Sequence, residues 1–264
     1  MVKTIGIIGS GMIGSALARL SINAGFNVIV SNSRGADTLS AFIRELGSHA
    51  KAASVEEAAK ESDLIIVAIP MKAYSSLPAA AFKNKIVIDT MNYYPGRDGQ
   101  IPELDAAKLT SSELLQQHLQ GAKVVKALHN LDFHHLYTNA SSHNNTSRTT
   151  LPIAGDDVKS KQEVAAFMNA IGYNSVDIGS LSESWKIEPG TPIYVMPYVP
   201  KIPDGLTEEE ARKWYLETPG TPVSEAQAKE LVSKAVRSFP VGGFPEVLPS
   251  VHIALVKEEV NKRK

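Results

Sequence analysis

The stretch "KTIGIIGSGMIGSALARL", residues 3–20, decides the fold. Its first seven residues are largely apolar and β-branched, which predicts a buried strand. Three glycines follow at Gly9, Gly11 and Gly14, and the residues after them repeat apolar side chains at helical spacing. The order of strand, G-x-G-x-x-G turn and helix is typical of a βαβ unit that binds a dinucleotide.

Each glycine of this motif has a physical role. Gly9 permits the tight turn, Gly11 lets the backbone approach a pyrophosphate, and Gly14 permits close packing of the helix on the strand. The helix N-terminus offers unpaired N–H groups and a partial positive charge to the phosphates. A glycine-rich turn without a nucleotide is the alternative. The predicted cofactor contacts of the motif are Gly9, Ser10, Gly11, Met12, Ile13 and Gly14.

The second predicted strand ends in "VIVSNSRG", residues 28–35, and carries no carboxylate. An NAD-selective site has Asp or Glu here, because the carboxylate binds the ribose 2′-hydroxyl and would repel a 2′-phosphate. This chain has Ser31, Asn32, Ser33 and Arg34 instead. A serine can donate a hydrogen bond, and an arginine can clamp a phosphate bidentately. The pattern favours NADP(H), with a solvated surface turn as the alternative.

Strand and helix patterns alternate through the first two thirds of the chain, which predicts a doubly wound α/β fold with a mostly parallel Rossmann sheet. The predicted strands are 3–9, 27–33, 63–69, 85–91, 123–129, 150–155 and 174–180, and the helices are about 12–24, 36–47, 55–61, 73–81, 111–119 and 157–171. After Trp185 the sequence is rich in proline and aromatic residues, followed by helical patterns at about 207–217 and 224–238. We therefore predict an NADP-binding domain over 1–180 and a smaller, mainly helical region over 181–264 for substrate or dimerisation.

Composition excludes several classes of partner. The 264 residues contain 27 Lys and Arg against 28 Asp and Glu, so no global field attracts nucleic acid or an anionic membrane. The longest apolar run, residues 64–70, is far shorter than the roughly 20 residues of a membrane-spanning helix. Cysteine is absent, which excludes disulfides and thiolate chemistry. We expect a cytoplasmic protein without nucleic-acid or membrane partners. The polar stretch 138–150 is expected to be a mobile loop.

Five motifs occur in order: "SNSRG", "DLIIVAIPMKAY", "VIDTMNYYPG", "VVKALHN" and "PIAGDD". Together with the glycine motif they make residues 3–180 resemble the F420-dependent NADP oxidoreductases and the cytoplasmic domains of the six-transmembrane metalloreductases. The resemblance implies that the nicotinamide end is lined by Ile69, Pro70, Met71 and Ala154, with Asn92, His129 and Asn130 at the equivalent strand ends. Ligands in open α/β sheets bind beyond the carboxyl ends of the strands, which supports these positions. Pro70 and Met71 could equally be a strand terminator and a core residue.

The resemblance and the motifs lead to a hypothesis of hydride transfer between NADPH and a flat small-molecule redox acceptor, such as F420, a flavin or a quinone. Such transfer depends mainly on stacking and orientation of two rings. We take His129 and Asn130 as the catalytic candidates. Reduction of a carbonyl or imine would instead need a proton donor, and the candidates are His129, His134, Tyr194 and Tyr198. A nucleotide sensor without turnover is a further alternative.

The stretch "SESWKIEPGTPIYVMPY", residues 182–198, contains three of the substrate candidates. Trp185, Tyr194 and Tyr198 could form an aromatic slot, joined by His134; burial of the sheet edge or of a homodimer interface is the alternative. The histidines at 129, 134, 135 and 143 lack the spacing of metal ligands, so we expect no metal.

Overall fold

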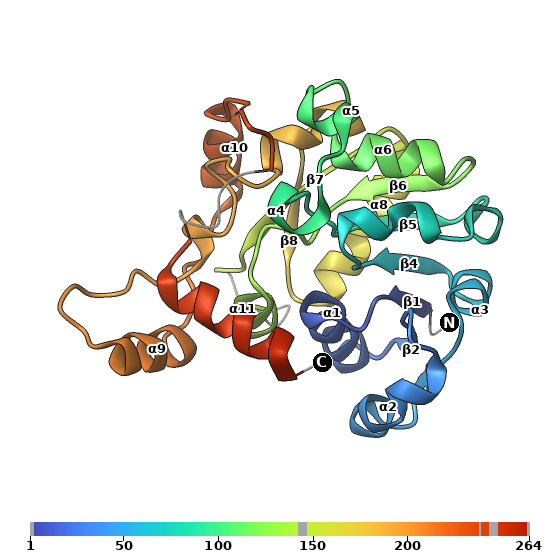
Figure 1. The fold of residues 1–264 in the computed structure, drawn as a ribbon, viewed down its shortest axis with the longest axis horizontal. Coiled ribbons are helices and arrows are strands. Elements are labelled where there is room, and N and C mark those ends of the chain that lie inside the picture. The colour runs from blue at the N-terminus through green and yellow to red at the C-terminus, as the bar shows by residue number, and fades with distance from the viewer. Residues whose placement is uncertain (1–2, 142–146, 238, 243–247, 263–264) are drawn as a thin grey trace.

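The computed structural model describes residues 3–141, 147–237, 239–242 and 248–262. Within these residues eight strands form one sheet in the order β3-β2-β1-β4-β5-β6-β7-β8, the doubly wound arrangement expected from the sequence (Figure 1). The strands are β1 Thr4–Ile8, β2 Asn27–Ser31, β3 Ala50–Ala52, β4 Leu64–Val67, β5 Ile86–Asp89, β6 Lys123–Lys126, β7 Thr150–Gly155 and β8 Asn174–Asp177.

Helices connect the strands and extend the chain beyond the sheet. The α-helices are α1 Met12–Asn23, α2 Ser40–Leu46, α3 Val55–Glu61, α4 Pro95–Asp98, α5 Pro102–Asp105, α6 Ser111–His118, α7 Phe133–Thr138, α8 Val158–Ala170, α9 Glu208–Glu217, α10 Glu225–Ser233 and α11 Ser250–Lys262. Short 3-10 helices are η1 Ala36–Leu39, η2 Met71–Ser76, η3 Ala79–Phe82, η4 Leu181–Ile187 and η5 Met196–Tyr198.

The sheet is covered on both faces, as a parallel sheet with nearly uninterrupted apolar strands requires. On one face strand residues such as Ile5 and Ile7 pack with Leu17 of α1 and Phe167 of α8. On the other face a second core cluster joins the strands to α3, η3 and α6. A third, smaller cluster contains Tyr215 of α9 and residues of α11.

Three local differences separate the structure from the expectations. The seven predicted strands form, but the three-residue strand β3 was missed because "AKA" has no strand pattern. The helix expected over 73–81 is two 3-10 turns, since Leu77 precedes Pro78 and is held extended at φ −67° and ψ 133°. The helices α4, α5, α7 and α11 were also missed.

The parallel ladder ends at β6. Strands β1 to β6 run parallel, whereas β7 pairs antiparallel with β6, and Ala154 stands opposite Lys126. The carboxyl end of β7 therefore points away from the edge at which β1 to β6 end. Ala154 nevertheless lies level with Lys126, the last residue of β6, and so at the carboxyl edge of the parallel strands, and its side chain is fully buried. Its place at the nicotinamide end stays a prediction.

The part of the chain after β8 lies beyond the carboxyl ends of the parallel strands. In Figure 1 the strands β4 and β5 lead toward the middle of the view, and the C-terminal helices α9, α10 and α11 stand on that side. The segment directly after η4 still packs in the main core, because Ile193 and Tyr198 belong to the same cluster as the strand residues. The division into two domains at residue 180 stays a prediction.

Candidate functional site

The glycine loop after β1 leaves open space only where a phosphate would approach. Gly9 has φ +109°, and a Cβ atom there would lie 2.3 Å from the Ala68 carbonyl oxygen. A Cβ on Gly14 would lie 1.8 Å from the Gly9 carbonyl oxygen. A Cβ on Gly11, by contrast, would have no atom within 4 Å among the described residues. Gly9 and Gly14 therefore serve packing, while Gly11 keeps the surface accessible.

Helix α1 presents its N-terminus at this opening. Gly11 is the N-cap and has no side chain to accept from the first-turn N–H groups. Met12 and Ile13 begin the helix, and the Ser15 hydroxyl donates to the Ser10 carbonyl oxygen over 3.1 Å, which fixes the turn. Exposed N–H groups and the helix dipole together make this terminus suitable for a pyrophosphate.

Asn32 organises the loop after β2. Its Nδ2 donates to the Thr38 hydroxyl over 2.9 Å and to the Ser10 hydroxyl over 3.3 Å, and its Oδ1 accepts from the Arg34 backbone N–H over 3.0 Å. One amide thus joins this loop to the glycine loop. Ser31 does not take part, because it is fully buried and its hydroxyl donates to the Ile7 carbonyl oxygen. The prediction that the Ser31 side chain contacts the cofactor is therefore corrected, because this side chain is buried in the protein.

Ser33 and Arg34 stand exposed beyond that turn. The first acidic residue after β2 is Asp37, in the exposed first turn of η1. The residues at this end therefore fit a 2′-phosphate, since a hydroxyl and a guanidinium stand here and no carboxylate ends the strand. Their contact with NADP(H) stays a prediction.

The three residues after β4 that were predicted at the nicotinamide end differ in their burial. Ile69 is half-buried, and its side chain lies 3.0 Å from the position that a Cβ on Gly9 would take, so it borders the glycine loop. Pro70 is exposed. Met71 is fully buried in the second core cluster, which makes it a core residue and contradicts its assignment to the nicotinamide end.

The predicted catalytic pair is buried. His129 is 1% exposed and Asn130 is 0% exposed, and both donate to the carbonyl oxygen of Ile187, over 2.8 and 2.9 Å. Because a carbonyl oxygen only accepts, Nε2 of His129 carries the proton. Burial, together with the nearby Lys126 ammonium, holds the pKa of His129 well below its usual value. These side chains fasten the segment at Ile187 to the end of β6, and the geometry gives no support to a catalytic role.

A buried charged network, which the sequence reasoning missed, lies below them. Lys126 is fully buried and ion-paired with Asp89 at 3.3 Å; its ammonium also donates to the Ser111 hydroxyl over 3.2 Å and to the Met91 carbonyl oxygen. The Ser111 hydroxyl donates to Glu188 over 2.6 Å. The network joins β5, β6 and α6 to the residue after Ile187. A lysine and an aspartate inside apolar strand runs were the available signal.

Asn92, three residues after the carboxyl end of β5, hydrogen-bonds the segment around Tyr194. Its Nδ2 donates to the Tyr194 hydroxyl over 3.3 Å and to the His129 carbonyl oxygen over 3.2 Å. The Tyr194 hydroxyl is hydrogen-bonded to the Tyr94 hydroxyl, and the Arg97 guanidinium lies 4.9 Å from the centre of the Tyr94 ring. Asn92, Tyr94 and Tyr194 are half-buried and Arg97 is exposed; Tyr94 and Arg97 were not predicted.

The other substrate candidates do not join Tyr194. Tyr198 is fully buried in the main core, and Trp185 lies against Arg237, 5.9 Å from the guanidinium carbon to the ring centre. Nε2 of His134 donates to the Leu216 carbonyl oxygen over 3.0 Å, and burial lowers the pKa of His134. The predicted aromatic slot of three rings is not formed in this structure.

Asp132 is the centre of a second buried polar cluster, at the start of α7. It accepts from Nδ1 of His135 over 2.7 Å and from the Tyr215 hydroxyl over 3.1 Å, and that hydroxyl lies 3.4 Å from Nδ1 of His252. The cluster ties α9 and α11 to the sheet. Among the described residues no group of three or more histidines and carboxylates could hold a metal ion. His143, one of the histidines considered above, lies outside the described residues.

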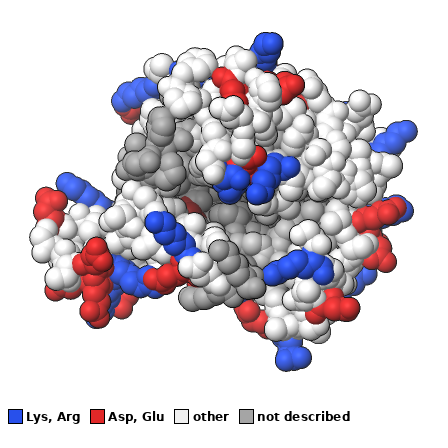
Figure 2. All heavy atoms as spheres, in the orientation of Figure 1, with Lys and Arg blue, Asp and Glu red and all other residues white. Residues whose placement is uncertain are grey.

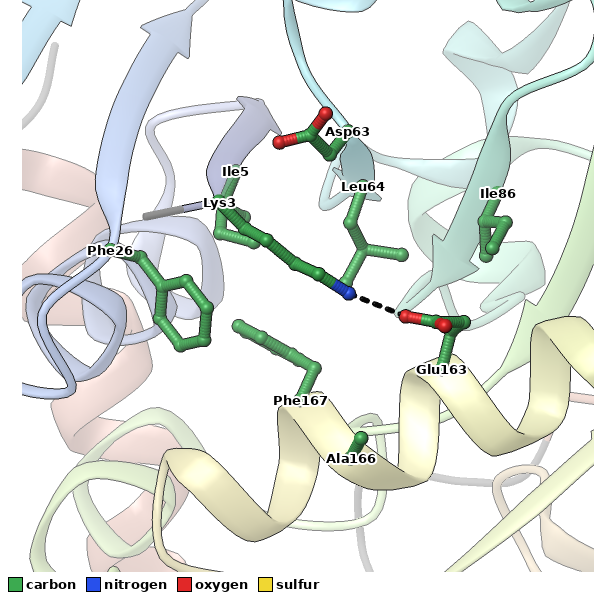
Figure 3. A pocket seen from close by; sticks show the side chains of 9 residues that line it. All are labelled: Lys3, Ile5, Phe26, Asp63, Leu64, Ile86, Glu163, Ala166 and Phe167. Carbon is green, nitrogen blue, oxygen red and sulfur yellow. Dashed lines mark hydrogen bonds and ion pairs between the residues drawn. The ribbon is translucent and has the colours of Figure 1, made fainter. Parts of the chain in front are cut away.

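A cavity of about 300 Å³ opens at the opposite edge of the sheet (Figure 3). Ile5 and Leu64 line it from the strands and Phe167 from α8, and Lys3 reaches Glu163 over 2.5 Å. It lies at the amino ends of the strands, away from the glycine loop. Figure 2 shows that the face seen in Figure 1 is hollowed near its centre, with side chains of Lys and Arg and also of Asp and Glu around the hollow.

Comparison with known proteins confirms the resemblance. Residues 4–93 match the family described as "NADP oxidoreductase coenzyme F420-dependent". The chain is 28% identical over 195 residues to metalloreductase STEAP3 of Rattus norvegicus, covering 73% of this chain and 37% of that protein. It is 26% identical to human metalloreductase STEAP2, covering 70% of this chain and 35% of that protein. The chain thus spans little more than a third of the length of these curated relatives.

Two solved structures are similar in fold. A hypothetical protein from Sinorhizobium meliloti superposes with a TM-score of 0.66 at 28% identity, over 74% of this chain and 94% of that one. A "putative F420 dependent NADP-reductase" from Arthrobacter superposes with a TM-score of 0.58 at 21% identity, over 70% and 87% of the two chains. The nucleotide-binding part of the chain is therefore similar to NADP-dependent oxidoreductases. No helix in the described parts of the chain has the length and apolar character to cross a membrane.

Proposed function

We propose that the protein is an NADP(H)-dependent oxidoreductase that transfers hydride between NADPH and a flat redox acceptor. The observation that carries the proposal is the open space at Gly11, at the N-terminus of α1, beside a β2 end with Arg34 and no carboxylate. In this proposal Gly9 to Gly14 bind the pyrophosphate, and Ser33 and Arg34 bind the 2′-phosphate. The similarity to NADP oxidoreductases supports the same cofactor.

The acceptor is proposed to lie between the carboxyl ends of β4 and β5 and the segment around Tyr194. Support comes from the half-buried side chains of Ile69, Asn92 and Tyr194 at that edge. F420, a flavin and a quinone share a flat conjugated ring, and the family match favours F420 among them. NADP(H), when bound, supplies the hydride. The protein residues orient the two rings and exclude water. A cytoplasmic location and a homodimer stay predictions.

Reduction of a carbonyl or imine is the second candidate function. The observation that favours it is the hydrogen-bonded pair of Tyr94 and Tyr194, because such substrates require a proton donor within hydrogen-bond reach. The two functions share the cofactor site and differ in the acceptor.

Cofactor choice is tested by titrating the protein with NADPH and with NADH. We expect Arg34→Ala to weaken NADPH binding by about tenfold or more, since a charge-assisted hydrogen bond is worth about 1.5–3 kcal/mol, and to leave NADH binding nearly unchanged. Arg44→Ala is the matched control, because Arg44 is an exposed arginine in the last turn of α2. Equal losses for both cofactors would refute the phosphate clamp.

Turnover is tested by anaerobic oxidation of NADPH against F420, riboflavin, 1,4-naphthoquinone and a panel of ketones and imines. Oxidation with a flat acceptor supports the first function, and oxidation with the ketones or imines alone supports the second. Tight NADPH binding without oxidation by any acceptor would identify a nucleotide sensor and contradict both.

A further inference from the structure

Two tyrosines that are 100 residues apart in sequence share one hydrogen bond at the open edge of the sheet. Tyr94 is the N-cap residue of α4, in the connection after β5, and Tyr194 comes from the segment that His129 and Asn130 fasten to the end of β6. Asn92 donates to the Tyr194 hydroxyl over 3.3 Å. Hydride transfer to a flat acceptor, the first function proposed above, assigns no role to Tyr94, to Arg97 or to the pair.

The hydrogen count of this pair leaves one proton unused. Two phenols carry two hydroxyl hydrogens, and the bond between them uses one. Asn92 supplies a further hydrogen of its own to Tyr194. If Tyr194 accepts from both neighbours, its own hydrogen is available, and if it donates to Tyr94, the hydrogen of Tyr94 is available. In either arrangement the pair has one donor left for a ligand atom with a lone pair.

The surroundings of the two hydroxyls keep them protonated, and the nearby Arg97 stabilises the phenolate that remains after a proton has left. Burial raises the pKa of both Tyr94 and Tyr194, so neither is ionised at neutral pH. The Arg97 guanidinium, 4.9 Å from the Tyr94 ring centre, acts in the opposite direction and favours the phenolate of either tyrosine. Arg97 itself is held by the buried carboxylate of Asp98 at 2.8 Å and by the Asn92 carbonyl oxygen at 2.7 Å.

We propose that Tyr94 and Tyr194 are the proton-donating unit for an acceptor that carries a conjugated carbonyl oxygen or imine-like nitrogen. The proposal rests on the function proposed above. As the acceptor takes a hydride, with its two electrons, from NADPH, negative charge develops on that oxygen or nitrogen. The phenolic O–H bond breaks, a bond to hydrogen forms on the acceptor atom, and the proton of a water molecule restores the phenol. Asn92 and Arg97 are positioning residues that hold the phenolate.

The chemistry of the cluster selects this class of acceptor. The groups around the two hydroxyls, the Asn92 amide and the Arg97 guanidinium, are donors, and donors favour an atom on which negative charge grows. F420, flavins and quinones offer such an atom, and so do simple ketones and imines. The shared feature is the conjugated carbonyl or imine, so one set of variants tests all of them.

The test compares Tyr94→Phe and Tyr194→Phe with the wild type and with Tyr137→Phe. Tyr137 is a suitable control because it is an exposed tyrosine of α7, with 41% of its surface accessible. With whichever acceptor the wild type turns over, we expect kcat to fall by about 100-fold or more in at least one cluster variant, as for loss of a general acid. The Kd for NADPH should stay within about twofold, and the control should match the wild type in both.

A binding measurement separates a chemical role from a structural one. In the presence of NADP⁺, which prevents turnover, we expect 1,4-naphthoquinone to bind about fivefold more weakly to the cluster variants, as for the loss of one hydrogen bond. Unchanged kcat and unchanged naphthoquinone binding in both cluster variants of an active protein would overturn the inference and leave the proposed function standing. Absence of NADPH binding by the wild type would overturn both.

Discussion

Two regions at the carboxyl edge of the sheet are built in different ways. The nucleotide end is the proposed cofactor site around the glycine loop and Asn32, and the acceptor end is the proposed acceptor site around Asn92 and Tyr194. At the nucleotide end the residues that act together are close in sequence, since the glycine motif spans six positions and Asn32 bonds Arg34 two residues later. At the acceptor end the bonded residues are 58 apart for His129 and Ile187, and 102 apart for Asn92 and Tyr194. Local sequence therefore builds the proposed cofactor site, whereas tertiary packing builds the proposed acceptor site.

The largest expected effect is on the buried network below the acceptor end. Lys126→Met leaves Asp89 buried without its ion pair, and such losses cost about 3–5 kcal/mol. We expect the free energy of unfolding, measured in urea, to fall by about 4 kcal/mol. Lys123→Met in the same strand is the control, because that side chain is 53% exposed and should change stability by less than about 1 kcal/mol. Equal losses in the two variants would show that β6 itself, rather than the network, holds the acceptor end.

A pair of glycine variants tests the nucleotide end. Gly14→Ala places a Cβ 1.8 Å from a backbone oxygen, so we expect the free energy of unfolding to fall by about 2–3 kcal/mol, as for other overpacked positions. Gly11→Ala meets no described atom within 4 Å. It should keep the wild-type stability and weaken NADPH binding. A Gly11→Ala protein that binds NADPH as tightly as the wild type would contradict the placement of the pyrophosphate.

Low pH should destabilise the acceptor end before the nucleotide end. This is the smallest of the three expected changes in stability. Burial lowers the pKa of His129, His134 and His252, all on the acceptor side. The unfolded chain therefore binds these protons more tightly than the folded one, and the stabilisation that is complete above the ordinary histidine pKa of 6.5 is lost as the pH falls below it. We expect Tm to fall by a few degrees from pH 7.5 to pH 5.5.

Hydrogen exchange locates this acid effect. On lowering the pH, amide protection should decrease in α9 and α11 more than in α1, because the Tyr215 hydroxyl lies 3.4 Å from His252 and bonds Asp132. His252→Asn should reduce the pH dependence. Equal loss of protection in α1 would show that the two ends of the edge are not separable.

The same difference explains how far the sequence could predict this molecule. The fold and the glycine loop followed from contiguous patterns. Ser31 is the last residue of β2 and Met71 begins η2 after β4, but both side chains are fully buried. Which way a residue at or just after a strand end faces depends on the packing around it. Ala154 stands at the expected edge, beside the last residue of β6, but the antiparallel direction of β7 was not predicted.

At the acceptor end the sequence identified positions more often than roles. His129 and Asn130 are where expected, yet both bond the Ile187 carbonyl oxygen, a partner that no local pattern indicates. Tyr194 was predicted both for its aromatic ring and as a proton donor, and in the structure its hydroxyl makes the contact with Asn92. Tyr94 and Arg97 were missed because a turn after a strand gives no sign of what will pack on it.

The attachment of the segment around Tyr194 at three points has a mechanical consequence. The segment is bound at Ile187 by two side chains, at Val195, whose N–H donates to the Asn130 carbonyl oxygen over 2.8 Å, and at the Tyr198 carbonyl oxygen, which accepts from Asn139 over 3.1 Å. The segment is therefore attached to the end of β6 and to α7 along its length. If α9 and α11 move relative to the sheet, we expect the hinge to lie beyond Tyr198, so that Tyr194 keeps its place beside Asn92.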